Sequence, residues 1–494
     1  MENNNRRQFL KKMAAISAGL IFAPNIFSEV GTIQNFKPMT RKFGKINFNV
    51  TTFGLGGQAS LQWTPDDVDP VRIIEKAFHL GVNYFDTSNV YGPSQLNFGK
   101  AFRNLNLIPD KSGYDKNLRK SIFLTAKSGL RLAKGYKKDP NVKDMSDCGN
   151  FSIGCIGDLK RTLSQIFGDG KGYYPKGAYV NMFLVHMVET FEDVEAIFLG
   201  LDNPSPELEQ IGSLAALVDY RDGTNKTGLN PAKERLIRHI GFSGHRKASV
   251  LMQTIQKDVH NVFDAVLIPI NPNDVLYRSM QYNVLPIARA KNMGIIAMKV
   301  FADGAMYNRK KKGDVIRTVG SSALDYRNLV QYTVSTTGVH TTIVGIGEIN
   351  DDPVKCQLSS NLKAAQINWG GLTENERKRI ELITAKIGNG KTNGFQEQGN
   401  HLIPPGNVKV SSSISKKKMS NIITWYTAYA GSAELDFYEI YRNDKLIATI
   451  PFTPQITQEP YQYDDPVRKG EVSDYKLAVV DKTGDRAFTE SIII

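Results

Sequence analysis

From residue 41 onward, short apolar runs alternate with longer amphipathic stretches along most of the chain. Eight of these runs have the length and composition of buried β-strands, and helical periodicity fills several of the intervals between them. This order is typical of βα units, and eight strands are what a closed (β/α)8 barrel requires. The sequence therefore predicts an α/β fold built on a TIM barrel. The predicted strands cover residues 51–55, 82–86, 122–126, 180–185, 238–243, 265–270, 294–299 and 341–345.

The stretches between the predicted strands carry helix and loop signals. Residues 69–81 and 283–294 have helical patterns that end near a glycine or asparagine suited to a C-cap. Residues 41–50 are expected to form a small hairpin that closes the bottom of the barrel. Two connections, 129–151 and 187–206, exceed the usual length of about 4 to 6 residues. We expect them to be substrate-specificity loops, with mere decoration of the barrel as the alternative.

Polar side chains stand at the carboxyl ends of three neighbouring predicted strands. Asp86 ends the second strand and Tyr91 follows five residues later. Lys127 and His186 stand at the ends of the third and fourth strands. Parallel strands in one closed sheet bring these ends to the same mouth of the barrel. Taken singly, each residue is more often a loop anchor or a hydrogen-bonded core group, but together they predict a catalytic site.

A tyrosine can serve as a general acid in such a group. Its hydroxyl has an ordinary pKa of about 10, so proton donation requires that the phenolate be stabilised. The ammonium of Lys127 is expected to lower the pKa of Tyr91, and Asp86 is expected to hold that ammonium in place. His186 is expected to hydrogen-bond the carbonyl oxygen of a substrate, where negative charge develops.

These residues and their surroundings resemble the aldo-keto reductase family over residues 41–390. The resembling segments occur in order as FDTSNVYGPS, TAKSG, LVH, IRHIGFSG, IIAMKVFADG and VSTTGVHTTIVGIGEIND. The resemblance implies that Tyr91 is the proton donor and that a nicotinamide cofactor lies across the barrel mouth. It places cofactor contacts at Ser243, Gly244, Met298, Lys299, Gly345, Gly347 and Asn361. Glycines suit such positions because the backbone must approach a phosphate closely, although an ordinary tight turn explains the last two glycines equally well.

The chain departs from the family pattern at three places. A glycine, Gly244, stands where members carry an asparagine after the fifth strand, and His245 follows it, so one amide contact to nicotinamide is lost or replaced. The sixth strand lacks the usual glutamine. Residues 348–352, after Gly347, are mainly acidic where many members carry a basic residue for the 2′-phosphate of NADP. Acidic groups repel that phosphate, so either NAD or NADP is expected, with NAD favoured.

The first thirty residues have the layout of an export signal. Two arginines precede an apolar run, from residue 13 to residue 23, that is too short to span a bilayer. The segment resembles a twin-arginine signal through Arg6, Arg7, Phe9, Leu10 and Lys11. That resemblance implies passage of the folded protein through the twin-arginine export machinery into the periplasm. An amphipathic helix docked on the domain is the alternative, and cleavage or retention of the signal stays open.

The pattern changes after residue 390. Residues 391–405 are rich in glycine and asparagine, close with two prolines, and are interpreted as a linker. Residues 406–494 contain short alternating strands, which predict a small all-β sandwich. This region resembles a fibronectin type III module, with Trp425 on an early strand and Tyr475 placed as a tyrosine corner. Docking on the barrel and contact with a surface or carbohydrate partner are both expected roles.

Charge and cysteine content exclude some functional classes. The net charge of +13 comes from basic residues scattered over several segments, so nucleic-acid binding is not expected. Three cysteines cannot form a disulfide framework or a zinc site of the CxxC type, and no metal site is predicted. A bridge between Cys148 and Cys155 after export and two inert thiols are both open.

The leading functional hypothesis is an exported oxidoreductase that moves a hydride between a nicotinamide cofactor and a small carbonyl or alcohol substrate, such as a sugar. A cofactor that stays bound and is recycled by a second substrate would allow this chemistry outside the cytoplasm. One alternative is a non-catalytic sensor or scaffold that binds nicotinamide. The other is a carbohydrate-active hydrolase, which needs two carboxylates about 5 to 10 Å apart, and the strand ends supply Asp86 without a clear partner.

Overall fold

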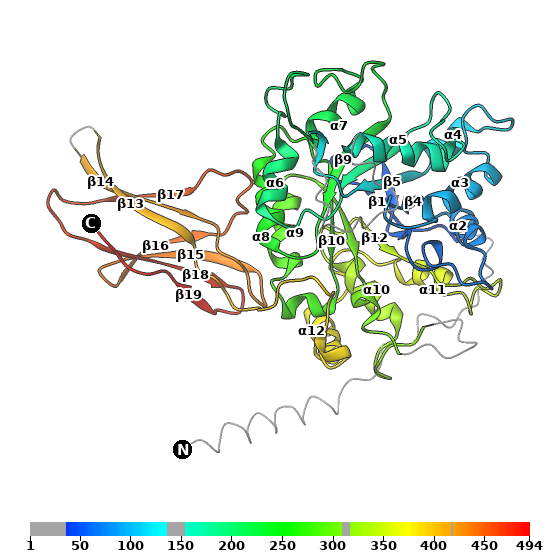
Figure 1. Ribbon diagram of the computed structural model, residues 1–494. Helices are drawn as coiled ribbons and strands as arrows, with labels where there is room; N and C mark the ends of the chain where they lie inside the picture. The colour runs from blue at the N-terminus through cyan, green and yellow to red at the C-terminus, as the bar shows by residue number, and fades with distance from the viewer. Residues whose placement is uncertain (1–35, 136–153, 309–316, 416–417) are drawn as a thin grey trace. The chain divides into compact units, whose positions relative to one another are not determined.

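The computed structural model describes residues 36–135, 154–308, 317–415 and 418–494. Eight parallel strands form a closed barrel in chain order, so the predicted (β/α)8 fold is confirmed (Figure 1). Each strand overlaps one of the predicted runs. The barrel strands are β3 (Phe53–Leu55), β4 (Tyr84–Asp86), β5 (Phe123–Ser128), β7 (Val180–Val185), β9 (Ile237–Ser243), β10 (Ala265–Pro269), β11 (Gly294–Met298) and β12 (Thr341–Val344).

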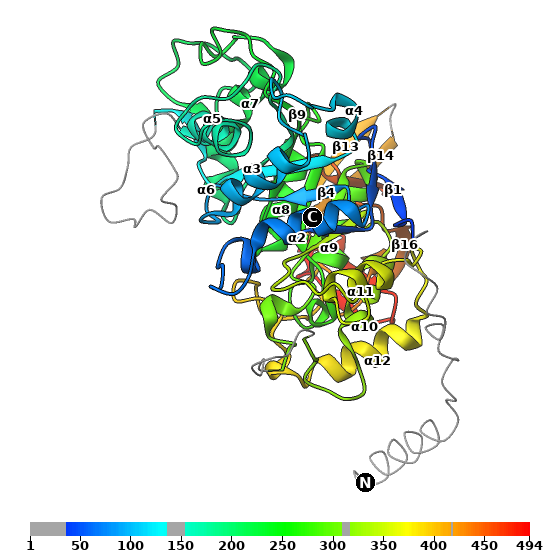
Figure 2. The same cartoon turned by 90° about the vertical axis from the view of Figure 1, so that its right-hand side faces the viewer.

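Helices surround the barrel (Figure 1 and Figure 2). The first predicted helical segment forms α2, which starts with Asp69 as N-cap and Pro70 in its first turn, an arrangement that satisfies free backbone N–H groups. The second forms α9, capped by Ser279. The helices are α2 (Pro70–His79), α3 (Ser94–Asn104), α4 (Lys116–Lys120), α5 (Gly154–Phe167), α6 (Phe191–Phe198), α7 (Ser213–Asp222), α8 (Ala248–Lys257), α9 (Met280–Ala290), α10 (Tyr326–Ser335), α11 (Gln357–Ala364) and α12 (Glu374–Thr384).

The predicted hairpin packs beneath the barrel core. It consists of β1 (Thr40–Lys42) and β2 (Asn49–Thr51), which pair antiparallel. The turn between them buries Phe43 completely, with its ring edge-on to Tyr84 and Phe123 at centroid distances of 5.9 and 5.4 Å. A side chain at Gly294 would come within 2.6 Å of the Phe43 ring, so a glycine there admits the aromatic plug.

The prediction that residues 187–206 form a long loop is wrong. Residues 187–206 contain the helix α6, which begins with a capping box between Thr190 and Asp193. The two residues satisfy each other's backbone N–H groups and so nucleate a helix in a connection that composition alone leaves open. In the other connection, β6 (Leu132–Lys134) pairs with β8 (Ile211–Gly212). Residues 136–153 of that connection lie outside the described residues.

The predicted all-β region is confirmed as two antiparallel sheets with a shared apolar core around Trp425 and Tyr438. The sheet orders are β13-β14-β17 and β16-β15-β18-β19, with β20 beside β18. Its likeness to a fibronectin type III module stays a prediction. The strands are β13 (Gly406–Ser415), β14 (Lys418–Tyr426), β15 (Leu435–Arg442), β16 (Lys445–Pro451), β17 (Tyr461–Pro466), β18 (Asp474–Asp481), β19 (Arg486–Phe488) and β20 (Ile492–Ile493).

The segment interpreted as a linker, residues 391–405, is docked on the barrel. The side chain of Asn271, just after β10, donates to the hydroxyl of Thr392 at 2.8 Å. Asp274, which is fully buried, accepts a hydrogen bond from the side-chain amide of Gln396. Buried polar partners of this kind fix the chain in place, which glycine-rich composition does not reveal.

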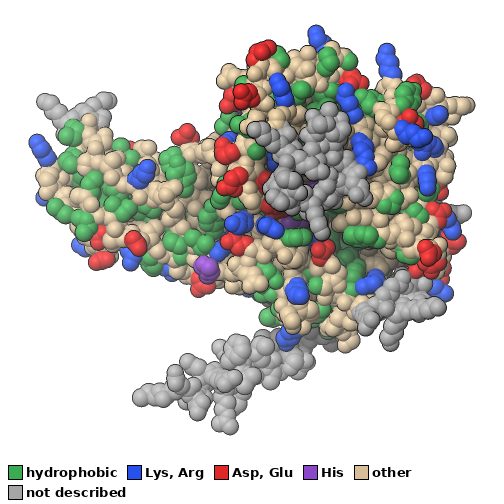
Figure 3. Space-filling model, in the orientation of Figure 1, with side chains coloured by type: hydrophobic (Ala, Val, Ile, Leu, Met, Phe, Trp, Pro, Cys, Tyr) green, Lys and Arg blue, Asp and Glu red, His purple; other side chains and the backbone are tan. Residues whose placement is uncertain are grey.

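Basic and acidic side chains are interspersed on the face of the molecule shown in Figure 3. In the described ranges, no helix combines the length and the apolar character needed to cross a bilayer. The predicted signal, residues 1–30, lies outside those ranges, as does Cys148. Cys155 is buried in α5 and Cys356 is buried near α11, and both are free thiols.

Removing the aromatic plug at the bottom of the barrel is expected to destabilise it. Phe43→Ala leaves a cavity bordered by Tyr84 and Phe123, so it should lower the free energy of unfolding of the barrel by about 3–5 kcal/mol. Phe191→Ala, at a side chain that is 43% exposed, is the matched control and should cost about 1 kcal/mol or less. Urea denaturation of both variants measures the difference, and equal losses would contradict this account of the core.

Candidate active site

The barrel brings the four predicted catalytic side chains to one end. Asp86 is the last residue of β4, and Lys127 is the last but one residue of β5. His186 directly follows β7, and Tyr91 lies in the connection from β4 to α3. The strands β4, β5 and β7 are consecutive neighbours in the barrel, so their carboxyl ends converge.

Lys127 is the centre of this group. Its ammonium donates to the Oδ1 atom of Asp86 at 2.5 Å, to the backbone oxygen of Thr87 at 2.9 Å and to the hydroxyl oxygen of Tyr91 at 3.4 Å. Lys127 and Asp86 are both fully buried, whereas Tyr91 is half-buried. Because an ammonium only donates, the Tyr91 oxygen accepts, and its own hydrogen is left for another partner.

Burial reverses the expected direction of the pKa shift of Tyr91. Burial raises the pKa of Tyr91, although the charge of Lys127 opposes the shift. The expectation that Lys127 lowers the Tyr91 pKa therefore describes one contribution, which desolvation outweighs. Burial also raises the pKa of Asp86 against the pull of Lys127. Burial alone would lower the pKa of Lys127, but the charge of Asp86 and the hydrogen bonds to Asp86 and Tyr91 raise it overall. Tyr91 is therefore protonated at neutral pH, and Lys127 is charged.

His186 is held neutral. Its side chain is 4% exposed, and its ring lies edge-on to that of Tyr91 at a centroid distance of 6.0 Å. Burial, followed by the charge of Lys127, holds the pKa of His186 well below its ordinary value. A neutral imidazole can donate a hydrogen bond to an oxygen beside Tyr91 without adding a charge to the site.

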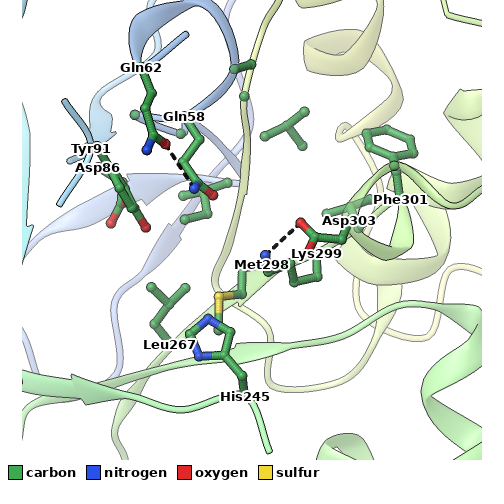
Figure 4. A pocket seen from close by; sticks show the side chains of 18 of the residues that line it. Gln58, Gln62, Asp86, Tyr91, His245, Leu267, Met298, Lys299, Phe301 and Asp303 are labelled. Carbon is green, nitrogen blue, oxygen red and sulfur yellow. Dashed lines mark hydrogen bonds and ion pairs between the residues drawn. The ribbon is translucent and has the colours of Figure 1, made fainter. Parts of the chain in front are cut away.

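A cavity of about 500 Å³ opens above this group. Figure 4 shows part of its wall, with Asp86 and Tyr91 on one side and the residues after β11 on the other. Of the four predicted catalytic residues, Lys127 is the one that does not line the cavity. The predicted residues that line the cavity are Asp86, Tyr91, His186, Met298, Lys299 and Gly345.

Three predicted cofactor residues support backbone instead of lining the cavity. The hydroxyl of Ser243 accepts from the backbone N–H of Met187 at 3.0 Å. The backbone oxygen of Gly347 accepts from the hydroxyl of Ser60 at 2.6 Å. A side chain on Gly244 would lie 2.8 Å from the backbone oxygen of Val188, so any residue larger than glycine requires the backbone to shift there.

Asn361 does not line the cavity. It lies on α11 and is fully buried. Within the described residues, neither its Nδ2 nor its Oδ1 atom has a hydrogen-bond partner, which is uncommon because unpaired buried polar atoms cost free energy. Its contact with the cofactor stays a prediction.

The acidic run after Gly347 is partly neutralised. The carboxylate of Asp351 lies 3.3 Å from the guanidinium of Arg72, and that of Asp352 lies 3.7 Å from the ammonium of Lys355. These exposed pairs reduce the repulsion that the run exerts on a phosphate. The preference for NAD therefore stays a prediction.

Sequence reasoning missed three contributors to the cavity region. Trp63, 64% exposed, lines the cavity shortly after β3, and Phe395 lines it from the segment interpreted as a linker. Glu189 is buried three residues after His186 and holds His245, which also lines the cavity. Trp63 and Glu189 could have been chosen as candidates because each lies soon after the end of a predicted strand. Nothing in the sequence around Phe395 marks it as part of the cavity. In the described parts of the chain, no three His, Cys, Asp or Glu side chains are placed to hold a metal ion.

The neutral state of His186 makes a prediction about acid stability. Below its ordinary pKa of about 6.5, the unfolded chain binds a proton at His186 that the folded protein does not, so folding stability falls as pH falls. His186→Gln should remove this loss, changing the stability difference from wild type by up to about 1.4 kcal/mol per pH unit below pH about 6.5. Urea denaturation from pH 8 to pH 5 measures it. His79→Gln, at an exposed histidine, is the control, and parallel curves for wild type and His186→Gln would refute the neutral state.

Comparison with known proteins agrees with this geometry. The model of the family described as "Aldo/keto reductase family" matches residues 52–344. A curated relative, aldo-keto reductase AFTS1 of Alternaria alternata, is 23% identical over 248 residues, which are 49% of this chain. The match spans 58% of the length of that relative.

Solved structures also align with the barrel region. An aldo-keto reductase from Bacillus halodurans in its holo form is 17% identical with a TM-score of 0.41, over 70% of this chain and 96% of that chain. One from Bombyx mori in complex with NADP is 14% identical with a TM-score of 0.44, over 71% and 94% of the two chains. Because the family model covers more than half of the sequence, the chain belongs to the aldo/keto reductase family.

Proposed function

We propose that the protein transfers a hydride between a nicotinamide cofactor and a small carbonyl or alcohol substrate, with Tyr91 as general acid and base. The observation that carries the proposal is the buried ammonium of Lys127, which contacts both Asp86 and the hydroxyl oxygen of Tyr91 beneath the cavity. A lysine placed there has a chemical use, because it stabilises a tyrosine that has lost its proton.

Each side chain has one task in carbonyl reduction. When bound, nicotinamide supplies the hydride. Tyr91 gives its hydroxyl proton to the carbonyl oxygen, and Lys127 stabilises the phenolate that results. Asp86 keeps the ammonium beside Tyr91. The neutral His186 donates a hydrogen bond to the same carbonyl oxygen and so stabilises the negative charge that develops on it. In alcohol oxidation, the phenolate of Tyr91 takes the proton back.

The cofactor would be held along the wall that Met298, Lys299 and Gly345 form. A side chain on Gly345 would come within 3.0 Å of Ala59, so the glycine allows the chain after β12 to pack closely against the chain after β3. We favour NAD over NADP because the residues after Gly347 include no basic side chain at the place where many family members have one. A sugar is the substrate class we favour, because aromatic and amide side chains, Trp63 and Gln62 among them, line the cavity.

Export to the periplasm is a further part of the proposal. Its support is the paired arginines before a short apolar run at the start of the chain. A protein that crosses the membrane folded can acquire its nicotinamide in the cytoplasm and keep it. Turnover in the periplasm then requires a second substrate that returns the bound cofactor to its starting state.

Replacing the proposed proton donor tests the chemistry. Tyr91→Phe should lower the turnover of aldehydes about 100-fold or more, while the dissociation constants for NADH and NADPH change little. Fluorescence titration with each cofactor and an aldehyde panel measure both, and the titration also compares NAD with NADP. Tyr173→Phe, at a side chain that is 62% exposed, is the matched control. If the wild type binds nicotinamide but turns over no substrate, the protein is a sensor or scaffold instead.

Replacing the arginine pair tests export. A variant with Arg6→Lys and Arg7→Lys keeps the charge of the segment but removes the pair, so it should accumulate in the cytoplasm, whereas Lys12→Arg should be exported normally. Cell fractionation gives the distribution. A native mass spectrum of the exported protein reports its mature N-terminus and any retained nicotinamide. Export of the double variant at the wild-type level would rule out this route.

A further inference from the structure

A second imidazole, His245, lies at the cavity beside the proposed catalytic group and has no role in the mechanism above. It comes shortly after β9 and is 6% exposed, and its partner Glu189 is 8% exposed. The Oε1 atom of Glu189 lies 2.9 Å from both the backbone nitrogen and the Nδ1 atom of His245. Its Oε2 atom accepts from the backbone N–H of Arg246 at 2.8 Å. A buried carboxylate therefore holds the imidazole through its Nδ1 atom and holds the backbone of His245 and Arg246 through two N–H groups.

The contacts of Glu189 determine which nitrogen of His245 carries the hydrogen. A carboxylate only accepts hydrogen bonds, so the Nδ1 atom that faces it must be the donor. In a neutral imidazole, the other ring nitrogen, Nε2, is then an acceptor. In the described part of the chain, Nε2 has no hydrogen-bond partner, and His245 is one of the residues that line the cavity. With the imidazole in its neutral form, the cavity wall thus presents one hydrogen-bond acceptor, the Nε2 atom.

Aromatic rings border this acceptor. The ring of Phe395 lies 5.9 Å from that of His245 at an interplanar angle of 67°, and the His186 ring lies 6.2 Å away. Phe395 is 43% exposed, and its neighbour Gln396 is tied to the buried Asp274. In Figure 4, the imidazole of His245 faces the cavity next to Leu267 and Met298. One wall therefore combines an apolar surface with one hydrogen-bond acceptor.

We infer that His245 is a substrate-positioning residue whose Nε2 atom accepts a hydrogen bond from a hydroxyl group of a polyhydroxylated carbonyl compound. The carbon chain of such a compound can pack against Phe395 while its hydroxyl satisfies the imidazole. A plain aldehyde leaves the buried acceptor unpaired, and an unpaired acceptor is what separates hydroxylated from unhydroxylated substrates. The inference rests on the proposed oxidoreductase function and names the substrate class of that same site.

A pair of substrates of equal length tests the hydroxyl preference. Wild type should favour D-glyceraldehyde over propanal in kcat/KM, and His245→Phe should reduce this ratio about tenfold, mainly through KM. His245→Gln keeps an acceptor and should restore part of the ratio. His260→Phe is the matched control, because His260 is an exposed histidine whose imidazole bonds a carboxylate, Asp202, on the surface. An unchanged ratio in His245→Phe would overturn the inference.

A binding measurement separates this inference from the proposed chemistry. Saturation-transfer NMR with D-sorbitol and bound NADH should detect sorbitol on the wild type and on Tyr91→Phe, but not on His245→Phe. Fluorescence titration should give NADH dissociation constants within about twofold for all three proteins. Loss of NADH affinity in His245→Phe, with the substrate ratio intact, would place His245 at the nicotinamide and refute the inference. Sorbitol binding without turnover by the wild type would refute only the oxidoreductase function.

Discussion

The ion pair between Lys127 and Asp86 is the contact on which the site depends. Both groups are fully buried, and charges inside a protein are stable only when they are paired closely. Their pairing requires the parallel register of β4 and β5, in which Asp86 lies opposite Thr125, two residues before Lys127. On the other side of β4, the backbone after β3 packs so closely that a side chain at Gly57 would lie 2.4 Å from the backbone oxygen of Asp86. The pair of charges therefore depends on β4 and β5 being neighbours in parallel register.

The order of the strands could be predicted because apolar runs and turn signals are local. The meeting of Asp86, Lys127, Tyr91 and His186 followed from that order, since any closed parallel barrel brings its strand ends together. The direction of the Tyr91 pKa could not be predicted, because it depends on how much protein covers the hydroxyl. Sequence spacing places charges in order along a chain but does not report desolvation.

Other features escaped prediction for the same reason. The docking of residues 391–405 depends on Asn271 and Asp274, which lie more than a hundred positions earlier in the chain and carry no motif. The role of Glu189 depends on β7 and β9 being neighbours in the barrel, so that a glutamate after one strand reaches a histidine after the other. Residues 391–405 were interpreted as a linker because they are rich in glycine and asparagine. Composition does not report which distant residues these side chains bind.

The docked segment also links the cavity to the sandwich that follows it. Arg278, after β10, donates to the backbone oxygen of His401 at 2.7 Å, while Asn283 bonds the backbone of Ala430. Phe395 is upstream of those contacts and belongs to the cavity wall. Among the described residues, none beyond residue 406 lines the cavity. Substitutions in residues 391–405 can therefore change the cavity wall at Phe395 while the proposed catalytic residues stay the same.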